Sequence, residues 1–146
     1  MKNLFFALAI TLFGTSAIAQ NTDALLGKYI AVKDALITGN SKTVSQELAE
    51  FHQAIKDETA FEQKADLLRA TEAMLKGATI EKQRAAFNNV STTMWKLVDT
   101  ERKDAAPVYY QYCPMKKAYW ISNEKEIKNP YYGAAMLNCG SVEEIK

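Results

Sequence analysis

The sequence predicts a mainly all-α fold: an up-and-down four-helix bundle on which an aromatic C-terminal segment packs as an irregular or short-hairpin structure. From Thr22 to Arg102 proline is absent, glycine is rare, and the good helix formers Ala, Leu, Lys, Glu and Gln dominate. Apolar residues in this stretch recur every three to four positions, which places them on one face of a helix. After Pro107 the period changes to two, which indicates an extended chain.

The N-terminus, residues 1–19, has the features of a signal peptide. Lys2 supplies the positive charge, an apolar run follows over 4–13, and Ala17-Ile18-Ala19 gives the small-x-small pattern of a cleavage site before Gln20. No cysteine stands at that site, so lipid attachment is not expected. The apolar run is too short to span a membrane. We therefore expect an exported protein, periplasmic or secreted, that is not inserted in the membrane after the signal is removed.

Residues 20–146 are expected to form a single domain, with the helical bundle over 22–102 and the Cys/Met/Tyr segment over 107–146. The full sequence has 18 basic and 17 acidic side chains, and removal of Lys2 with the signal leaves 17 of each; they form no basic block, which argues against nucleic acid or an anionic membrane as partner. The sequence has no GxSxG, HExxH, CxxC or glycine-rich phosphate loop. We therefore expect that the protein is not an enzyme.

The first helix is expected from Thr22 to Thr38, with Gly39 as its left-handed end. Asn40 or Ser41 is expected to cap the second helix, from Lys42 to Lys56. The apolar face of this second helix consists of Val44, Leu48, Phe51 and Ile55.

The third helix is expected from Ala60 to Lys76, ended by Gly77, and the fourth from Ile80 to Glu101, capped by Thr79. The third helix carries apolar residues at Phe61, Ala65, Leu68 and Leu75. The fourth carries a heptad-like series of Ile80, Phe87, Val90, Met94 and Leu97. The short joints between these helices favour antiparallel neighbours.

Residues 103–106 are expected to form a hinge before the C-terminal segment. An extended strand is expected over 108–113 and a second short strand over 119–121, with Lys116 and Lys117 in an exposed turn between them. A helical turn is expected to begin at Ser122. A further helical turn is expected over 131–139, ended by Gly140.

Aromatic residues are concentrated in this segment, which contains six of the seven tyrosines and Trp120. A disordered tail is poor in aromatic residues, so the segment is expected to fold onto the helices. The simplest role for so many rings is to cap one side of the bundle. The alternative is a surface that binds a partner protein, because Tyr and Trp are enriched at interfaces.

The motifs QYCPM, AYWIS, EKEIKNPYYG and MLNCG, in this order, resemble the C-terminal signature of a bacterial domain family of unknown function. Members of that family occur alone behind a signal peptide, or fused to the periplasmic adaptor (membrane-fusion) subunits of copper/silver-type heavy-metal efflux pumps. The stretch KYIAVKDALITGN also resembles the opening of the family, so the resemblance spans nearly all of 20–146. It implies a role in heavy-metal efflux or homeostasis, with such an adaptor as partner.

Carried over by position, the sulfur residues of the signature are Cys113, Met115, Met136 and Cys139. The CysProMet run also resembles the CysProMetHis segments of copper transporters, but Lys116 takes the place of the histidine. Tyr112 likewise stands where many members of the family have histidine before the first cysteine.

These sulfur residues could form a soft metal site. Cys113 and Met115 are two positions apart in extended chain and share a side, whereas Met136 and Cys139 share a face if their turn is helical. Two thiolates and two thioethers would select Cu(I) or Ag(I) over Mg(II), Ca(II) or Mn(II). His52 is a candidate further ligand, although a lone histidine beside an apolar face is more often a packing or surface residue.

The alternative for the two cysteines is a Cys113–Cys139 disulfide, which is the usual state of an even cysteine count in an oxidising compartment. Closing this loop would stabilise the fold by about 3 kcal/mol. Two functions therefore stay open. One is an exported metal-binding module that buffers Cu(I) or Ag(I) or delivers it to an efflux adaptor. The other is a disulfide-stapled helical interaction module without metal.

Overall fold

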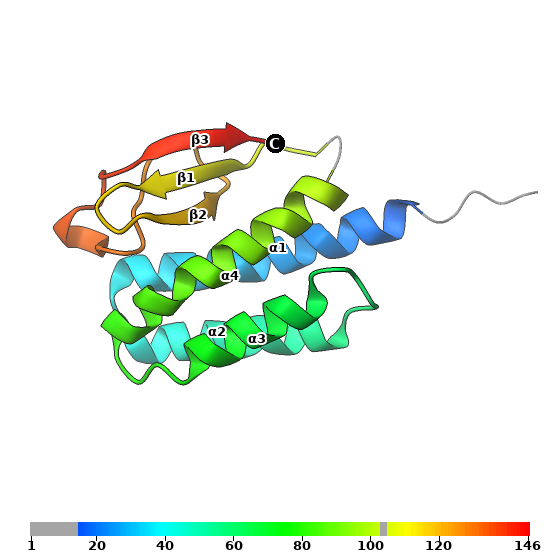
Figure 1. Cartoon of the computed structure of the whole chain (residues 1–146), viewed down its shortest axis with the longest axis horizontal. Coiled ribbons are helices and arrows are strands. Elements are labelled where there is room, and N and C mark those ends of the chain that lie inside the picture. Colours follow the sequence, from blue (N-terminus) through cyan, green and yellow to red (C-terminus); the bar gives the residue numbers. More distant parts are fainter. Residues whose placement is uncertain (1–14, 103–104) are drawn as a thin grey trace, which may run out of the picture.

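The computed structural model describes residues 15–102 and 105–146, in which four helices are followed by a small antiparallel sheet (Figure 1). The helices are α1 Thr15–Thr38, α2 Ser41–Asp57, α3 Lys64–Leu75 and α4 Ile80–Glu101. The strands are β1 Tyr109–Cys113, β2 Ala118–Ser122 and β3 Ser141–Ile145, and a 3-10 turn η1 spans Gly133–Ala135. The predicted mainly α fold is thus confirmed. The expected hairpin is present as β1 and β2, but a third strand joins it.

Two predictions fall wholly or partly outside the described residues. Most of the expected signal peptide lies in residues 1–14, and half of the expected hinge lies in residues 103–104. Among the helices of the described residues, none combines the length and apolar character needed to cross a membrane.

The helix ends follow the capping residues of the sequence. Gly39 has the positive φ of +77° that ends α1, and the side chain of Asn40 accepts the N–H groups of Lys42 and Thr43 at 3.0 and 3.1 Å. Thr79 caps α4 by accepting the N–H of Lys82. The predicted bounds of α4 are therefore confirmed, because its start is fixed by a local side-chain cap.

The prediction for the third helix was wrong in its start and incomplete in its buried face. The helix α3 begins at Lys64 rather than Ala60, because the preceding residues form a turn in which the Lys64 N–H bonds the Phe61 carbonyl. The fully buried residues are Leu67, Thr71 and Met74. Of the predicted apolar residues, Phe61, Leu68 and Leu75 are half-buried against the core and Ala65 is exposed. Thr71 can occupy the buried face because its hydroxyl donates to the Leu67 carbonyl at 2.9 Å, which satisfies the polar group.

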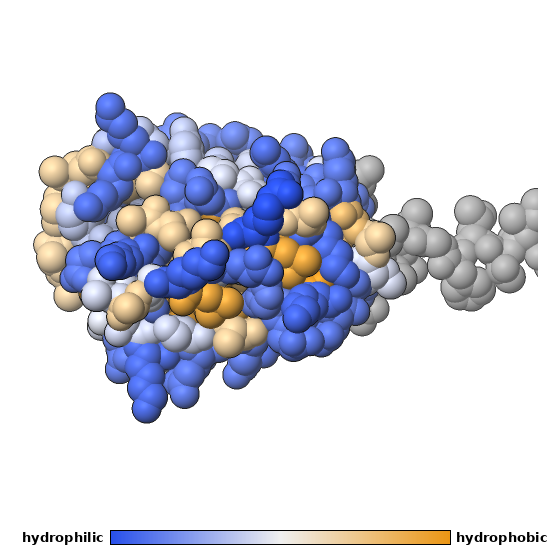
Figure 2. All heavy atoms as spheres, turned by 60° about the horizontal axis from the view of Figure 1, so that its bottom comes forward, coloured by the Kyte–Doolittle hydropathy of each residue, from blue (hydrophilic) through white to orange (hydrophobic). Residues whose placement is uncertain are grey.

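The elements are arranged in three layers, with α1 and α4 between the pair α2 and α3 on one side and the sheet on the other (Figure 1). Figure 2 views the molecule from the α2 and α3 side and shows a mainly hydrophilic surface with only small apolar areas. The core between the helices centres on Tyr29, whose ring stacks on Phe87 at 5.3 Å and meets the edge of Phe51 at 6.2 Å.

The sheet has the order β2-β1-β3 and rests on the helices by its edge strand β2 (Figure 1). The outward backbone groups of β2 are satisfied by helix side chains. The Ile121 N–H donates to the Tyr29 hydroxyl at 3.0 Å, and the Tyr119 N–H donates to the Asn88 side-chain oxygen at 2.8 Å. The Tyr29 hydroxyl also bonds Ser91 at 2.7 Å, and its burial raises the pKa of Tyr29 well above 10. One neutral phenol therefore connects α1, α4 and the sheet.

The two faces of the sheet are covered by different parts of the chain. On one face Tyr110 stacks on Trp95 of α4 at 4.5 Å and on Tyr119 at 4.8 Å. On the other face Gln111 donates from its side-chain nitrogen to three carbonyl oxygens of residues 124–126. We refer to residues 123–140, which cross this second face, as the covering segment. The aromatic cap predicted for the C-terminal segment is thus observed, and strands β1 and β2 are covered on both faces.

The predictions for the covering segment and β3 need correction. The helical turn expected at Ser122 is a series of bends, and the one expected over 131–139 is reduced to η1. Repeated hydrogen bonding of the segment to Gln111 replaces the local helical bonds. The strand β3 was not predicted at all, because its mostly exposed residues lack an alternating apolar pattern and their pairing with β1 is non-local.

The Tyr29 hydroxyl is expected to stabilise the attachment of the sheet to the helices. In Tyr29→Phe the buried Ile121 N–H loses its acceptor, so the free energy of unfolding should fall by about 1–3 kcal/mol in a urea titration. Tyr109→Phe is the control: that side chain is half-buried, and its hydroxyl has no hydrogen-bond partner among the described residues. The control should change stability by less than about 0.5 kcal/mol. Equal losses in the two variants would contradict the role of the Tyr29 hydroxyl.

Candidate functional site

The four sulfur residues of the C-terminal segment lie at one end of the sheet. Cys113 is the last residue of β1, and Met115 is in the turn 114–117 that joins β1 to β2. The register pairs Tyr112 of β1 with Ser141 of β3, so Cys139 lies just before β3 at this same end. Met136 is three residues earlier, and its carbonyl accepts the Cys139 N–H at 3.2 Å. We call this region the sulfur end of the sheet.

The four residues differ strongly in their exposure. The side chain of Met115 is 62% exposed, Met136 and Cys139 are half-buried, and Cys113 is fully buried. Both cysteines are free rather than joined to each other. Alternation along β1 places Cys113 on the same face as Gln111, under the covering segment that also contains Met136 and Cys139. The four residues therefore lie at one end of the sheet, but Met115 is in a turn and not in extended chain, and Met136 and Cys139 are not in a helical turn, so the two local geometries expected from the sequence are not formed.

Asn129 holds the covering segment in shape. Its side-chain nitrogen donates to the Cys139 carbonyl at 2.7 Å, and its side-chain oxygen accepts the Tyr131 N–H at 2.8 Å. Its own N–H donates to the Leu137 carbonyl at 2.7 Å. Because Asn129 is fully buried, these bonds are not weakened by competition with water. The backbone at Cys139 is thus fixed by a residue ten positions away.

A second junction holds the covering segment against the helices. Arg84 of α4 donates to the Pro130 carbonyl at 2.9 Å and to the Leu36 carbonyl at 2.8 Å, where α1 ends. Gly133 packs beside these groups with a positive φ of +55°. A Cβ atom there would lie 2.6 Å from the Ile37 carbonyl oxygen and 2.7 Å from the Arg84 guanidinium. Only glycine satisfies both the backbone angle and this close approach.

The structure does not bring His52 to the sulfur end. The Nδ1 atom of His52 bonds the Thr71 hydroxyl at 2.8 Å, and its Nε2 atom lies 3.8 Å from Glu72. The residue therefore connects α2 to α3, in the layer farthest from the sheet (Figure 1). Within residues 15–102 and 105–146, no group of three or more His, Cys, Asp or Glu side chains is placed to hold a metal ion. A metal at the sulfur end would depend on the two thiols and two thioethers alone.

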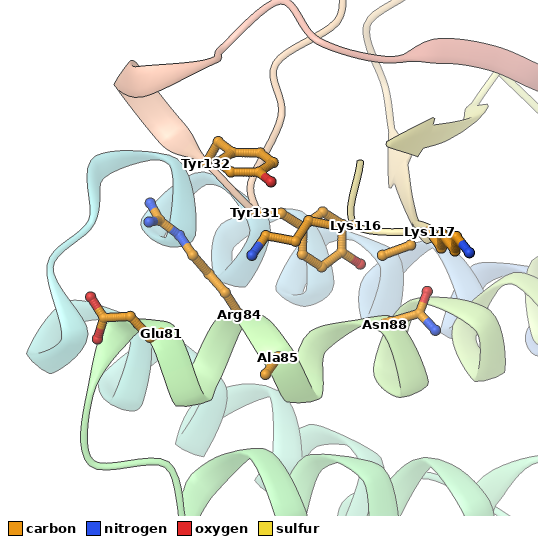
Figure 3. Close-up of a pocket in the computed structure, with 9 residues that line it drawn as sticks. Glu81, Arg84, Ala85, Asn88, Lys116, Lys117, Tyr131 and Tyr132 are labelled. Carbon is orange, nitrogen blue, oxygen red and sulfur yellow. The ribbon is translucent and has the colours of Figure 1, made fainter. Parts of the chain in front are cut away.

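A pocket of about 530 Å³ lies next to the sulfur end and was not predicted from the sequence. It is bounded by the first half of α4, the turn between β1 and β2, and the pair Tyr131 and Tyr132 (Figure 3). Lys116 and Lys117 occupy the exposed turn that the sequence predicted, and they also line this pocket. The adjacent lysines were the only signal in the sequence, because the other walls come from distant segments.

Comparison with protein-family models places the helical part of the chain in a known family. The model of a family described as "Protein of unknown function (DUF3347)" matches residues 25–105. No curated protein and no solved structure matches the chain. The matched residues cover the helical part, including the KYIAVKDALITGN stretch. They end before β1, so the four C-terminal motifs lie beyond them.

Gly133 is expected to be intolerant of a side chain. In Gly133→Ala the added methyl group meets the Ile37 carbonyl and must adopt a positive φ, so the free energy of unfolding should fall by about 2–4 kcal/mol. Gly27→Ala is the matched control, since a Cβ at this exposed helical position meets nothing within 4 Å. The control should stabilise the protein by about 0.5–1 kcal/mol. Thermal or urea unfolding measures the stability of both variants. If the two substitutions changed the free energy of unfolding in the same direction, the close packing at Gly133 would be contradicted.

The two thiols are expected to react at different rates. Titration of the native protein with a chromogenic disulfide reagent should modify Cys139 quickly and the fully buried Cys113 only after unfolding. Cys113→Ser should therefore keep the fast reaction, and Cys139→Ser should lose it. Equal rates for the two thiols would contradict the burial of Cys113 under the covering segment.

Proposed function

We propose, from the premise that the chain belongs to the DUF3347 family, that this protein is an exported module that carries a soft metal ion such as Cu(I) or Ag(I). The proposal includes a periplasmic or secreted location and a role in heavy-metal efflux or homeostasis. Its main support is one observation: Cys113, Met115, Met136 and Cys139 come from separate parts of the chain and lie at the same end of the sheet.

The donor set fits a soft monovalent ion better than a hard one. Thiolates and thioethers prefer Cu(I) and Ag(I), whereas Mg(II) and Ca(II) require oxygen ligands. Exposed Met115 and half-buried Met136 and Cys139 are accessible to an ion that arrives from solvent. Cys113 is buried under the covering segment, so in this proposal it becomes a ligand only when that segment moves and exposes its thiol. Binding would thus begin at the surface of the sulfur end.

A catalytic role for the cysteines is not proposed. A cysteine nucleophile requires a nearby base, and His52 is engaged with Thr71 between α2 and α3. The short helix connections favour an up-and-down bundle, and in this proposal the bundle is a rigid platform for the sulfur end. The partner would be the periplasmic adaptor of a metal efflux pump, which would receive the ion from the exposed turn.

The second candidate function is a helical interaction module closed by a Cys113–Cys139 disulfide. The position of both cysteines at the same end of the sheet favours this alternative as well. In this case the aromatic segment would dock to a protein partner and the methionines would have no role in binding. The two functions are therefore separated by what the methionines contribute.

A Cu(I) competition assay with a chromophoric chelator tests the proposal, with and without reductant. The wild-type protein should bind one ion under reducing conditions. Cys113→Ser/Cys139→Ser should weaken binding by at least about 100-fold, and Met115→Leu/Met136→Leu by about tenfold. Met94→Leu is the control, because this methionine is fully buried in the helical core and should leave the affinity unchanged.

The oxidised state is followed in parallel by intact mass and thiol titration. A protein that is bridged as purified, and whose Cu(I) affinity under reductant equals that of the double cysteine variant, would contradict metal binding. That result, with no effect of the methionine changes, is the one expected for the interaction module.

A further inference from the structure

The pocket beside the sulfur end has walls from three separate segments. Its floor is α4, with Arg84 and Asn88 one turn apart, and the turn between β1 and β2 forms the opposite wall with Lys116 and Lys117 (Figure 3). Tyr131 and Tyr132, which belong to the covering segment, close the side. A volume of about 530 Å³ is within the usual range for sites that hold a small molecule.

The polar groups that line the pocket are mainly hydrogen-bond donors. Lys116 and Lys117 contribute two ammonium groups, and neither is in an ion pair or hydrogen bond within the described part of the chain. The side-chain oxygen of Asn88 already accepts the Tyr119 N–H, so its NH₂ group is the part left to bind a ligand. Arg84 uses Nε and Nη2 for backbone carbonyls and keeps Nη1. An excess of donors and positive charge calls for an anionic ligand.

These groups are held in place before any ligand arrives. The Lys116 ammonium lies 4.9 Å from the centre of the Tyr132 ring, a cation–π distance that directs the side chain across the pocket (Figure 3). Lys117 has a positive φ of 51°, which fixes the turn. The Tyr131 hydroxyl donates to the Tyr119 carbonyl, so this ring is also fixed. Preorganised donors lose less entropy when they bind.

The rest of the lining sets the size and charge of the ligand. Ala85 and Ala118 are small, and together with the two tyrosine rings they make part of the lining apolar. Glu81 is the acidic residue of the lining, and its carboxylate disfavours a second negative charge on the ligand. We propose that this pocket binds a small organic monocarboxylate whose carboxylate contacts Lys116, the lysine that reaches across the pocket towards Tyr132, and whose apolar group lies against the tyrosines.

The test compares benzoate with benzamide, which has nearly the same shape and no charge. Both are titrated into the purified metal-free protein, and binding is followed by amide chemical shifts and calorimetry. Benzoate should bind at least about tenfold more tightly than benzamide and shift the amide signals of the 114–117 turn. Lys116→Gln/Lys117→Asn should weaken benzoate by at least about tenfold, and asparagine is chosen because it tolerates the positive φ of Lys117.

Lys125→Gln is the matched control, since this exposed lysine in the covering segment does not line the pocket and should leave benzoate binding unchanged. Benzamide binding as tightly as benzoate would overturn the proposal, and so would the absence of binding at about 10 mM benzoate. A double lysine variant that binds like the wild type would overturn it too. Because no metal is present in this assay and no sulfur residue is changed, its outcome is independent of the Cu(I) experiment.

Discussion

The attachment of the sheet to the helices depends on the satisfied edge of β2. An edge strand exposes backbone N–H and C=O groups. Burying these groups without hydrogen-bond partners would lower the free energy of unfolding, which is small in a domain of this size. In this protein Tyr29 and Asn88 accept two of the N–H groups, and Tyr131 donates to the Tyr119 carbonyl between them. The helices therefore stabilise the sheet by hydrogen bonds at its edge as well as by apolar packing on its faces. The sheet can therefore pack against the helical layer while the buried backbone groups of β2 remain hydrogen-bonded.

This attachment places both candidate sites. Since Asn88 fixes Tyr119 over the middle of α4, the turn before β2 is held above the first half of that helix. The turn then has two sides with different chemistry. Met115 is largely exposed to solvent, whereas the neighbouring Lys116 reaches toward Tyr132 in the pocket. Gly133 and Arg84 hold the covering segment at the same place, so the sulfur end and the pocket share their supporting residues.

The sequence was sufficient for features that depend on local chemistry. The caps at Asn40 and Thr79 and the apolar period of α4 are all encoded within one turn of the residues they affect. On α3 the sequence did not indicate that Thr71 is buried, because this residue is polar and lies in the core only through its hydrogen bond to the backbone. The strand β3 and the pocket were missed for a different reason. Both are formed by pairing between segments far apart in the chain, and no local pattern records such pairing.

The family match covers the helices and the α4 side of the pocket, whereas the sulfur end and the turn that carries the pocket lysines lie beyond it. The matched residues 25–105 include Tyr29, Arg84 and Asn88, the groups that hold the sheet and the covering segment. They include none of the four sulfur residues and neither of the two pocket lysines. The matched residues thus comprise most of the four helices and the helix side chains that contact the sheet and the covering segment. The function of this chain therefore depends on the sulfur end and the pocket that the helices support, because a fold alone does not determine a binding site.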